Sequence, residues 1–161
     1  MQEFYNECED KFHDECGVVG VYLNPEDEKI KAGKKNAAVL RYYALVSLQH
    51  LGQESAGICV SDGENVKIHK AMGLVSDVFN LEHLTDLNGF ISVGHVRYAT
   101  AGSKTIENAQ PMLIQSKLGS VAVAHNGQLV NYVQLREMFE ETGATFSSSS
   151  DTEVIVKLIA R

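Results

Sequence analysis

A cysteine at a charge boundary is the first feature of this sequence that suggests chemistry. Residues 1–15 hold six carboxylates against one lysine, whereas Cys16 opens the apolar, β-branched run of residues 17–23. If residues 1–15 were removed, Cys16 would gain a free α-amino group with a pKa of about 7.7 to 8.0, able to act as the base for its own thiol. The alternative is that Cys16 is a small buried residue at the start of a strand.

Arg97 and Thr100 form a second candidate site, at the end of a predicted strand over residues 89–100. An arginine offers a planar fork that binds a carboxylate through two parallel hydrogen bonds, and a threonine hydroxyl can add a third. The alternatives are a surface ion pair for Arg97 and a plain turn over residues 99–102.

Asn126 and Gly127 directly follow a predicted strand over residues 120–125. An asparagine side-chain amide and a glycine backbone N–H can both point at an oxygen that gains negative charge, and each such donor stabilises it by about 3 to 4 kcal/mol. Asn-Gly after a strand is also a common turn signal, which is the alternative. We expect His125 to support this loop by hydrogen bonds rather than to act as a base.

Asp151 lies in a capping-box pattern, Ser150-Asp151-Thr152-Glu153, that predicts a helix from Asp151 to Arg161. The macrodipole favours a carboxylate in the first helical turn, whatever else that carboxylate does. Its functional alternative is to bind the ammonium group of a ligand. With the thiol, the carboxylate clamp and the oxyanion hole, this completes the groups needed to hold a free amino acid and cleave its side-chain amide.

The apolar periodicity predicts an α+β domain. Spacings of three and four predict a helix over residues 34–51 that Gly52 can end. The Asp62-Gly63 turn predicts a hairpin that joins a small-residue strand at 55–61 to a strand of alternating apolar residues at 65–72. The other predicted elements are a strand at 17–23, a short helix at 77–87, strands at 89–100, 112–116 and 120–125, and helices at 131–142 and 151–161. This order is typical of sheets covered by helices.

Composition narrows the class of protein. The formal charge is -7 and most of it lies in residues 1–15, so the remaining chain lacks the basic stripe that nucleic acid requires. No apolar run approaches the roughly 18 residues of a membrane helix, and the acidic N-terminus is unlike a signal peptide. We therefore expect a soluble, cytoplasmic protein without a nucleic-acid or membrane partner. Cys8, Cys16 and Cys59 are too irregularly spaced for a zinc site or a disulfide framework, so we expect no metal site in this chain.

Five motifs, in this order, resemble those of class II glutamine amidotransferases, which are N-terminal-nucleophile (Ntn) hydrolases. They are Cys16-Gly17-Val18-Val19-Gly20, the stretch from Leu48 to Ile58, the stretch from Gly94 to Thr100, His125-Asn126-Gly127 and Ser150-Asp151-Thr152-Glu153. Within that class, the second motif is similar to that of the glutamine phosphoribosylpyrophosphate amidotransferases. The resemblance covers residues 16–161.

The resemblance implies a four-layered αββα sandwich, incomplete at the C-terminus. It divides the chain into an acidic propeptide at residues 1–15, removed in maturation, and a type 2 glutamine amidotransferase domain at residues 16–161. Cys16 would be the nucleophile and, through its α-amino group, the base. Asn126 and Gly127 would form the oxyanion hole.

The same resemblance implies how L-glutamine is held. Arg97 and Thr100 would bind its α-carboxylate, and Asp151 would bind its α-amino group. The reaction would be hydrolysis of glutamine to glutamate and ammonia. The intact enzyme would use that ammonia to convert phosphoribosylpyrophosphate to 5-phosphoribosylamine, in the first step of purine biosynthesis.

The synthetic half-reaction would require a phosphoribosyltransferase domain, which we do not expect within this chain. Phosphoribosylpyrophosphate, Mg²⁺ and a 4Fe-4S cluster would therefore be bound by residues outside it, in an intact enzyme that we expect to be a homo-oligomer; we expect no cofactor in the chain itself. Leu51 stands where family members usually have arginine. Two alternatives stay open: another class II amidotransferase, such as a glucosamine-6-phosphate synthase, and a non-catalytic truncated relative with a scaffold or regulatory role.

Overall fold

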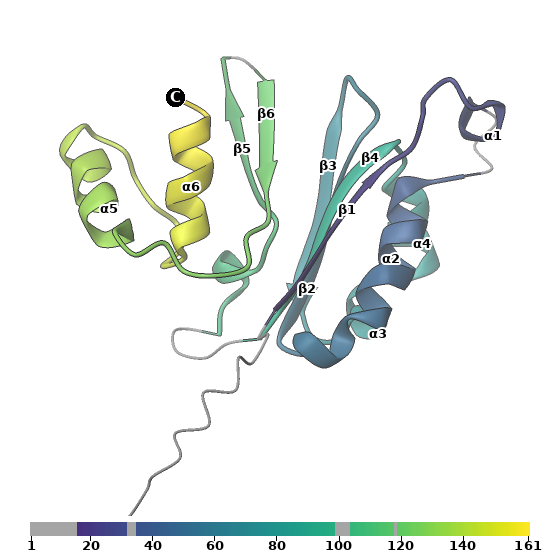
Figure 1. Cartoon of the computed structure of the whole chain (residues 1–161), viewed down its shortest axis with the longest axis horizontal. Helices are drawn as coiled ribbons and strands as arrows, with labels where there is room; N and C mark the ends of the chain where they lie inside the picture. Colours follow the sequence, from purple (N-terminus) through teal and green to yellow (C-terminus); the bar gives the residue numbers. More distant parts are fainter. Residues whose placement is uncertain (1–15, 32–34, 99–103, 118) are drawn as a thin grey trace, which may run out of the picture.

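An antiparallel sheet of four strands forms one half of the molecule. The computed structural model describes residues 16–31, 35–98, 104–117 and 119–161. The strands are β1 (Cys16–Tyr22), β2 (Ser55–Ser61), β3 (Val66–Met72) and β4 (Ile91–Arg97), in the order β1-β4-β2-β3. Each neighbouring pair is antiparallel. β4 lies between β1 and β2, although it is the last of the four strands in the chain (Figure 1).

Helices cover one face of this sheet. They are α2 (Ala37–Ser47), α3 (Val75–Val78) and α4 (Leu81–Asp86), and the short α1 (Glu28–Lys31) lies beyond the end of β1 (Figure 1). Alternation along β2 explains how the helices are attached to the sheet, because Ala56, Ile58 and Val60 all point into the same apolar core. Leu45 of α2 is fully buried against them, and burial of such a side chain contributes about 2 kcal/mol.

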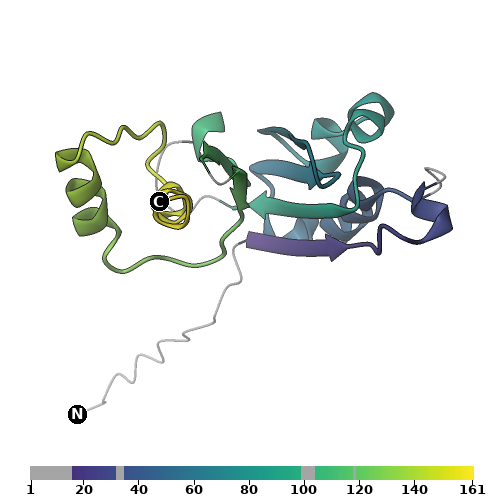
Figure 2. The ribbon, with the colours of Figure 1, turned by 90° about the horizontal axis from the view of Figure 1, so that it is seen from above.

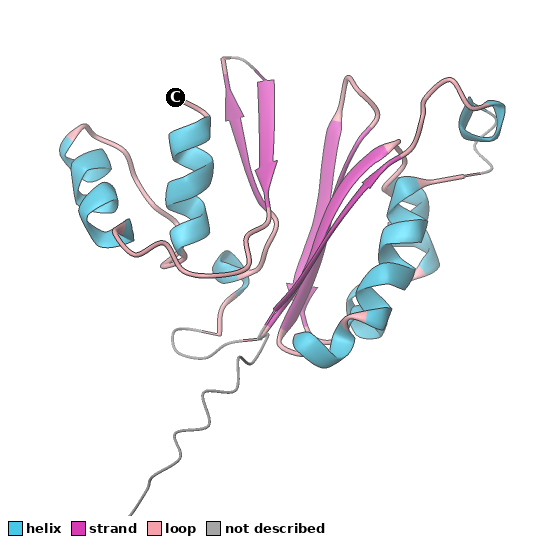
Figure 3. Ribbon diagram, in the orientation of Figure 1, coloured by secondary structure: helices cyan, strands magenta, loops and turns pink. Residues whose placement is uncertain are grey.

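A hairpin and two helices form the other half. Strands β5 (Met112–Ser116) and β6 (Gly119–Val123) pair with each other, and α6 (Asp151–Ile159) packs on both. Helix α5 (Tyr132–Glu141) lies on the far side of α6, so the layers follow the order helix, sheet, hairpin, helix (Figures 1 and 3). The expected α+β fold with αββα layering is confirmed.

The halves meet at the face of the large sheet that carries no helix. A Cβ on Gly57 of β2 would lie 2.1 Å from the carbonyl oxygen of Gln110 and 2.9 Å from Pro111, so only glycine allows this close approach. Lys70 of β3 reaches across and donates a hydrogen bond to the carbonyl oxygen of Ala109. The segment before β5 is thereby fastened against β2 and β3.

Most predicted elements are confirmed, with shifted boundaries and three differences. The helix predicted over residues 34–51 ends at Ser47 and is followed by a 3-10 turn, η1 (Gln49–Leu51). Gly52 does not end it by a left-handed conformation, since its backbone is extended. The helix predicted at 77–87 is two short helices, because Phe79 and Asn80 adopt extended backbone between α3 and α4.

The third difference concerns the predicted capping box at α6. Ser150 does cap this helix, and its hydroxyl accepts a hydrogen bond from the N–H of Thr152 at 3.2 Å. Glu153 does not reach back to Ser150, because its carboxylate binds the preceding loop instead. Within the described residues, no helix is long and apolar enough to cross a membrane.

Candidate active site

The strand register places Cys16 directly opposite Arg97. The two residues are paired Cα partners at the first position of β1 and the last position of β4. Opposed residues on antiparallel strands project from the same face, so the thiol and the guanidinium share one face of the sheet. Figure 2 shows the start of β1 and the arrowhead of β4 side by side next to the hairpin. The two predicted residues are therefore brought together.

Alternation along β4 decides which face they share. A Cβ on Gly94 would lie 2.5 Å from Arg41 of α2, so Gly94 faces the helices. Arg97, three positions later, projects from the opposite face, toward the hairpin. Cys16 is half-buried there, with its Sγ 3.8 Å from the backbone oxygen of Tyr98.

The loop after β6 closes over Cys16. The side-chain Nδ2 of Asn126 donates a hydrogen bond to the backbone oxygen of Cys16 at 2.8 Å. Gly127 has a φ of +132°, in the region that favours glycine, and a Cβ there would also press on the His125 ring at 3.3 Å. The loop itself is fastened by the N–H of His125, which donates to Oε1 of the buried Gln110 at 2.7 Å. This bond uses the backbone of His125, so the structural role expected for its side chain stays a prediction.

Asp151 reaches the same loop from the start of α6. Its Oδ2 accepts a hydrogen bond from the N–H of Leu129 at 2.6 Å, and its Oδ1 lies 3.8 Å from Nδ1 of His125. The Asp151 side chain is 15% exposed, so it is mostly buried. The structure therefore joins Asp151 to the Asn126-Gly127 loop, which in turn contacts Cys16.

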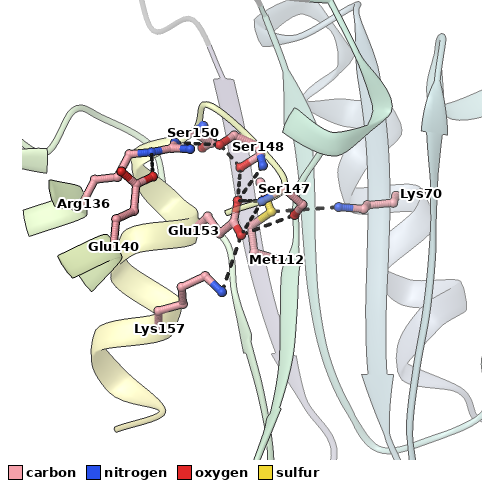
Figure 4. Close-up of polar contacts among 9 residues, drawn as sticks. All are labelled: Lys70, Met112, Arg136, Glu140, Ser147, Ser148, Ser150, Glu153 and Lys157. Carbon is pink, nitrogen blue, oxygen red and sulfur yellow. Dashed lines mark hydrogen bonds and ion pairs between the residues drawn. The ribbon is translucent and has the colours of Figure 1, made fainter. Parts of the chain in front are cut away.

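Glu153 holds the loop that positions Asp151. Its carboxylate accepts hydrogen bonds from the N–H and hydroxyl groups of Ser147 and Ser148, at 2.6 to 3.3 Å, and Lys157 lies 3.6 Å away (Figure 4). Burial raises the pKa of Glu153, but the Ser148 and Ser147 hydrogen bonds and the charge of Lys157 outweigh it, so the net shift is downward. The carboxylate thus stays ionised and fixes residues 147 and 148.

Arg97 has a partner that the sequence analysis did not assign. Its Nη1 donates to Oε2 of Glu54 at 3.2 Å, and the side chains of Arg97 and Glu54 are only 16% and 10% exposed. The surface ion pair considered as an alternative for Arg97 is therefore a mostly buried pair instead. The signal was present in the sequence, because a carboxylate immediately before β2 lies beside the end of whichever strand pairs with β2.

His95 lies on the same face of β4 as Arg97, two positions earlier. Its ring is fully buried. Burial lowers the pKa of His95 to about 4, although the neighbouring backbone of His125 favours the protonated ring. His95 is therefore neutral near pH 7 and adds no charge to the site.

The remaining residues named in the sequence analysis are Thr100, Cys8 and Cys59. Thr100 and Cys8 lie outside the described residues. Cys59 is buried in β2, and burial raises the pKa of its thiol to about 11, so it stays protonated near neutral pH. A protonated buried thiol is a poor nucleophile, which leaves Cys16 as the better candidate of the two described cysteines.

A separate cavity of about 380 Å³ lies between β3, β5 and α6, and no predicted site residue lines it. Its lining includes two lysines and two glutamates, so it carries no excess of either charge; these are Lys70, Lys157, Glu107 and Glu153. Across the described part of the chain, no group of three or more His, Cys, Asp or Glu side chains could hold a metal ion.

The sequence matches known proteins along almost its whole length. Residues 83–161 match the model of a glutamine amidotransferase domain. An amidophosphoribosyltransferase of Methanocaldococcus jannaschii is 48% identical over 146 residues, covering 91% of this chain and 29% of that protein. A chloroplastic amidophosphoribosyltransferase of Arabidopsis thaliana is 48% identical over 153 residues, covering 95% of this chain and 27% of that protein.

A solved structure shows the same fold. The glutamine phosphoribosylpyrophosphate amidotransferase of Bacillus subtilis, complexed with ADP and GMP, superposes with a TM-score of 0.75 and 44% identity, covering 89% of this chain and 29% of that one. The chain therefore has the α+β fold of that structure, and its residues 83–161 match a glutamine amidotransferase domain. More narrowly, it is similar to the glutamine domain of amidophosphoribosyltransferases, and it spans less than a third of the length of these relatives.

Proposed function

We propose that this chain is the glutamine-hydrolysing part of an amidophosphoribosyltransferase, with Cys16 as the nucleophile. The observation that carries the proposal is the pairing of Cys16 with Arg97 across β1 and β4, with Asn126 bonded to the Cys16 backbone. A thiol, a carboxylate-binding fork and an amide donor thus meet at one end of the sheet. This is the set of groups that side-chain amide hydrolysis requires.

The first step forms a thioester. Removal of residues 1–15 frees the Cys16 α-amino group, which takes the proton from Sγ as sulfur attacks the side-chain carbonyl carbon of glutamine. The amide oxygen becomes an oxyanion, stabilised by the Nδ2 of Asn126 and the N–H of Gly127. The C–N bond then breaks, the α-ammonium returns its proton to the leaving nitrogen, and ammonia departs.

The second step regenerates the enzyme. The α-amino group takes a proton from water as the water oxygen attacks the thioester carbon. Asn126 and Gly127 also stabilise the second oxyanion. The C–S bond breaks, glutamate is released and the thiol recovers its proton. Arg97 and Thr100 bind the substrate α-carboxylate throughout, and Asp151 binds its ammonium group.

The remaining half-reaction belongs to the intact enzyme. We propose that ammonia released here displaces pyrophosphate from phosphoribosylpyrophosphate, giving 5-phosphoribosylamine for purine biosynthesis, in a cytoplasmic homo-oligomer with no nucleic-acid partner. Support comes from the similarity to amidophosphoribosyltransferases and to a solved structure of the allosteric regulatory enzyme of purine biosynthesis, with 46% identity and a TM-score of 0.77. Mg²⁺ and any 4Fe-4S cluster would be held by other residues, and no step above passes through them.

The test compares the full-length wild-type protein with its Cys16→Ala variant. Intact mass should show loss of residues 1–15 only in the wild type, and glutamate release from glutamine should be confined to the wild type. Cys59→Ala is the matched control, since that thiol is buried and protonated and its variant should keep both properties.

The outcomes separate the competing functions. A folded, full-length wild-type protein that keeps residues 1–15 and releases no glutamate would be a scaffold or regulatory relative. Glutamate release combined with transfer of ammonia to fructose 6-phosphate would identify a glucosamine-6-phosphate synthase instead. If a glutamine-like alkylating agent modified Cys59 in place of Cys16, the proposal would have named the wrong nucleophile.

A further inference from the structure

Glu54 has a charged partner at the candidate site and no role in the reaction proposed above. It ends the extended segment between η1 and β2, and its carboxylate receives a hydrogen bond from Nη1 of Arg97 at 3.2 Å. Its backbone N–H also donates to the backbone oxygen of Arg97 at 2.9 Å. Glu54 is therefore bound to both the main chain and the side chain of the same arginine.

The segment behind Glu54 is built for close approach to β4. A Cβ on Gly52 would lie 2.6 to 2.8 Å from backbone atoms of Val96 and Arg97, so any larger residue would push the segment away from the strand. The Gln49 side chain shapes the turn, because its Nε2 donates to the Gly52 oxygen and its Oε1 accepts from the N–H of Val75 at 2.7 Å. The position of Glu54 is thus set by several independent contacts.

The ion pair between Glu54 and Arg97 also fixes the orientation of the guanidinium. Both side chains are mostly buried, so their attraction is screened less by water than that of an exposed pair. A guanidinium has five N–H donors in a fixed plane, and a bond from one Nη1 fixes the direction of the others. Holding Arg97 from one side aims its remaining donors without occupying them.

We propose that Glu54 is a positioning residue that aims the Arg97 guanidinium at the α-carboxylate of glutamine. This rests on the proposed function of Arg97 as the carboxylate clamp. Glu54 itself does not touch the substrate, and it stabilises bound glutamine only through Arg97. The consequence is that Glu54 contributes to affinity for amino acids that carry a free α-carboxylate, and to nothing else in the substrate.

The test uses Glu54→Gln in the full-length enzyme, since glutamine keeps the shape and one acceptor oxygen while removing the charge. We expect KM for glutamine to rise about tenfold, the size of a lost charge-assisted hydrogen bond, with kcat changed less than about threefold. Asp86→Asn is the matched control, because it removes an exposed pair with Lys67 far from the site and should leave both constants unchanged.

Two further readouts separate positioning from general stabilisation. L-Glutaminamide lacks the α-carboxylate, so Glu54→Gln should lower the preference for glutamine over it by about tenfold, whereas a merely unfolded fraction would lower both rates equally. In an Arg97→Lys background, Glu54→Gln should change KM by less than about twofold, because the group it acts through is gone. Glu54→Asp provides the same measurements if the glutamine variant does not fold.

Several outcomes would overturn the inference. These are an unchanged KM in Glu54→Gln, an equal loss for both substrates, and a full additional loss in the Arg97→Lys background. The proposed function fails separately, if wild type releases no glutamate or if Arg97→Lys alone leaves KM unchanged. Activity with a normal Arg97 effect but no Glu54 effect would therefore reject the positioning role alone.

Discussion

Lowering the pH from about 7.5 to about 5 should destabilise this domain through His95. The unfolded chain binds a proton at this side chain with the ordinary pKa of 6.5, whereas burial lowers the pKa to about 4 in the folded state. Between these values the unfolded state binds more protons, so the stability from neutral His95 is complete above pH 6.5 and is lost as the pH falls toward 4. At about pH 5 the loss comes to roughly 2 kcal/mol.

Urea denaturation at a series of pH values measures this effect. The lowered pKa of Glu153 moves the pH at which the stability from that carboxylate is lost further down. The test variant is His95→Gln, which cannot gain a proton, and its free energy of unfolding should vary less between about pH 7 and about pH 5, by roughly 2 kcal/mol. His50→Gln is the matched control for loss of a histidine, since His50 is exposed.

The test depends on how the free energy of unfolding changes with pH, rather than on its value at one pH. His95→Gln should lower stability at neutral pH through altered packing, and that loss is independent of the argument. If the wild type and His95→Gln lose stability in parallel between about pH 7 and about pH 5, then His95 is not a buried neutral ring and the reasoning is wrong.

Three further perturbations test the parts that position the site. Gly52→Ala should destabilise the protein by about 1 to 3 kcal/mol in urea denaturation, because the added Cβ meets the β4 backbone. Gly20→Ala is the control and should not destabilise it, because a Cβ there has nothing within 4 Å. Equal effects of the two substitutions would contradict the close approach of Gly52 to β4. Ser150→Ala should cost about 1 kcal/mol by the same assay through loss of the α6 cap, and an unchanged midpoint would disprove that cap. Glu153→Gln should cost about 2 kcal/mol and raise protease cleavage near Ser148, and unchanged cleavage would show that the loop is held otherwise.

Local pattern in the sequence predicted most elements of this fold. Small residues predicted β2 and alternating apolar residues predicted β3, and the Asp62-Gly63 turn predicted their hairpin, since Gly63 has the positive φ that such a turn needs. The end of α5 followed from Gly143 in the same way. These signals succeed because they depend on neighbours within a few residues. The same kind of reasoning failed at Gly52, where the glycine serves contact with a distant strand.

The sequence predicted the candidate site only in part. The types of Cys16, Arg97, Asn126 and Asp151 indicated their chemistry, and the order of motifs suggested that they act together. No local signal stated that Arg97 lies opposite Cys16, because strand pairing brings together residues far apart in the chain.

What the sequence by itself determined is the set of reactive groups and the secondary structure that carries them. What only the tertiary structure decided is their environment: the register of β1 with β4, the pairing of Glu54 with Arg97, the burial that keeps His95 neutral, and the use of Glu153 to hold residues 147 and 148. Propensity and alternation act over a few residues, whereas burial, pairing and pKa depend on every segment packed nearby.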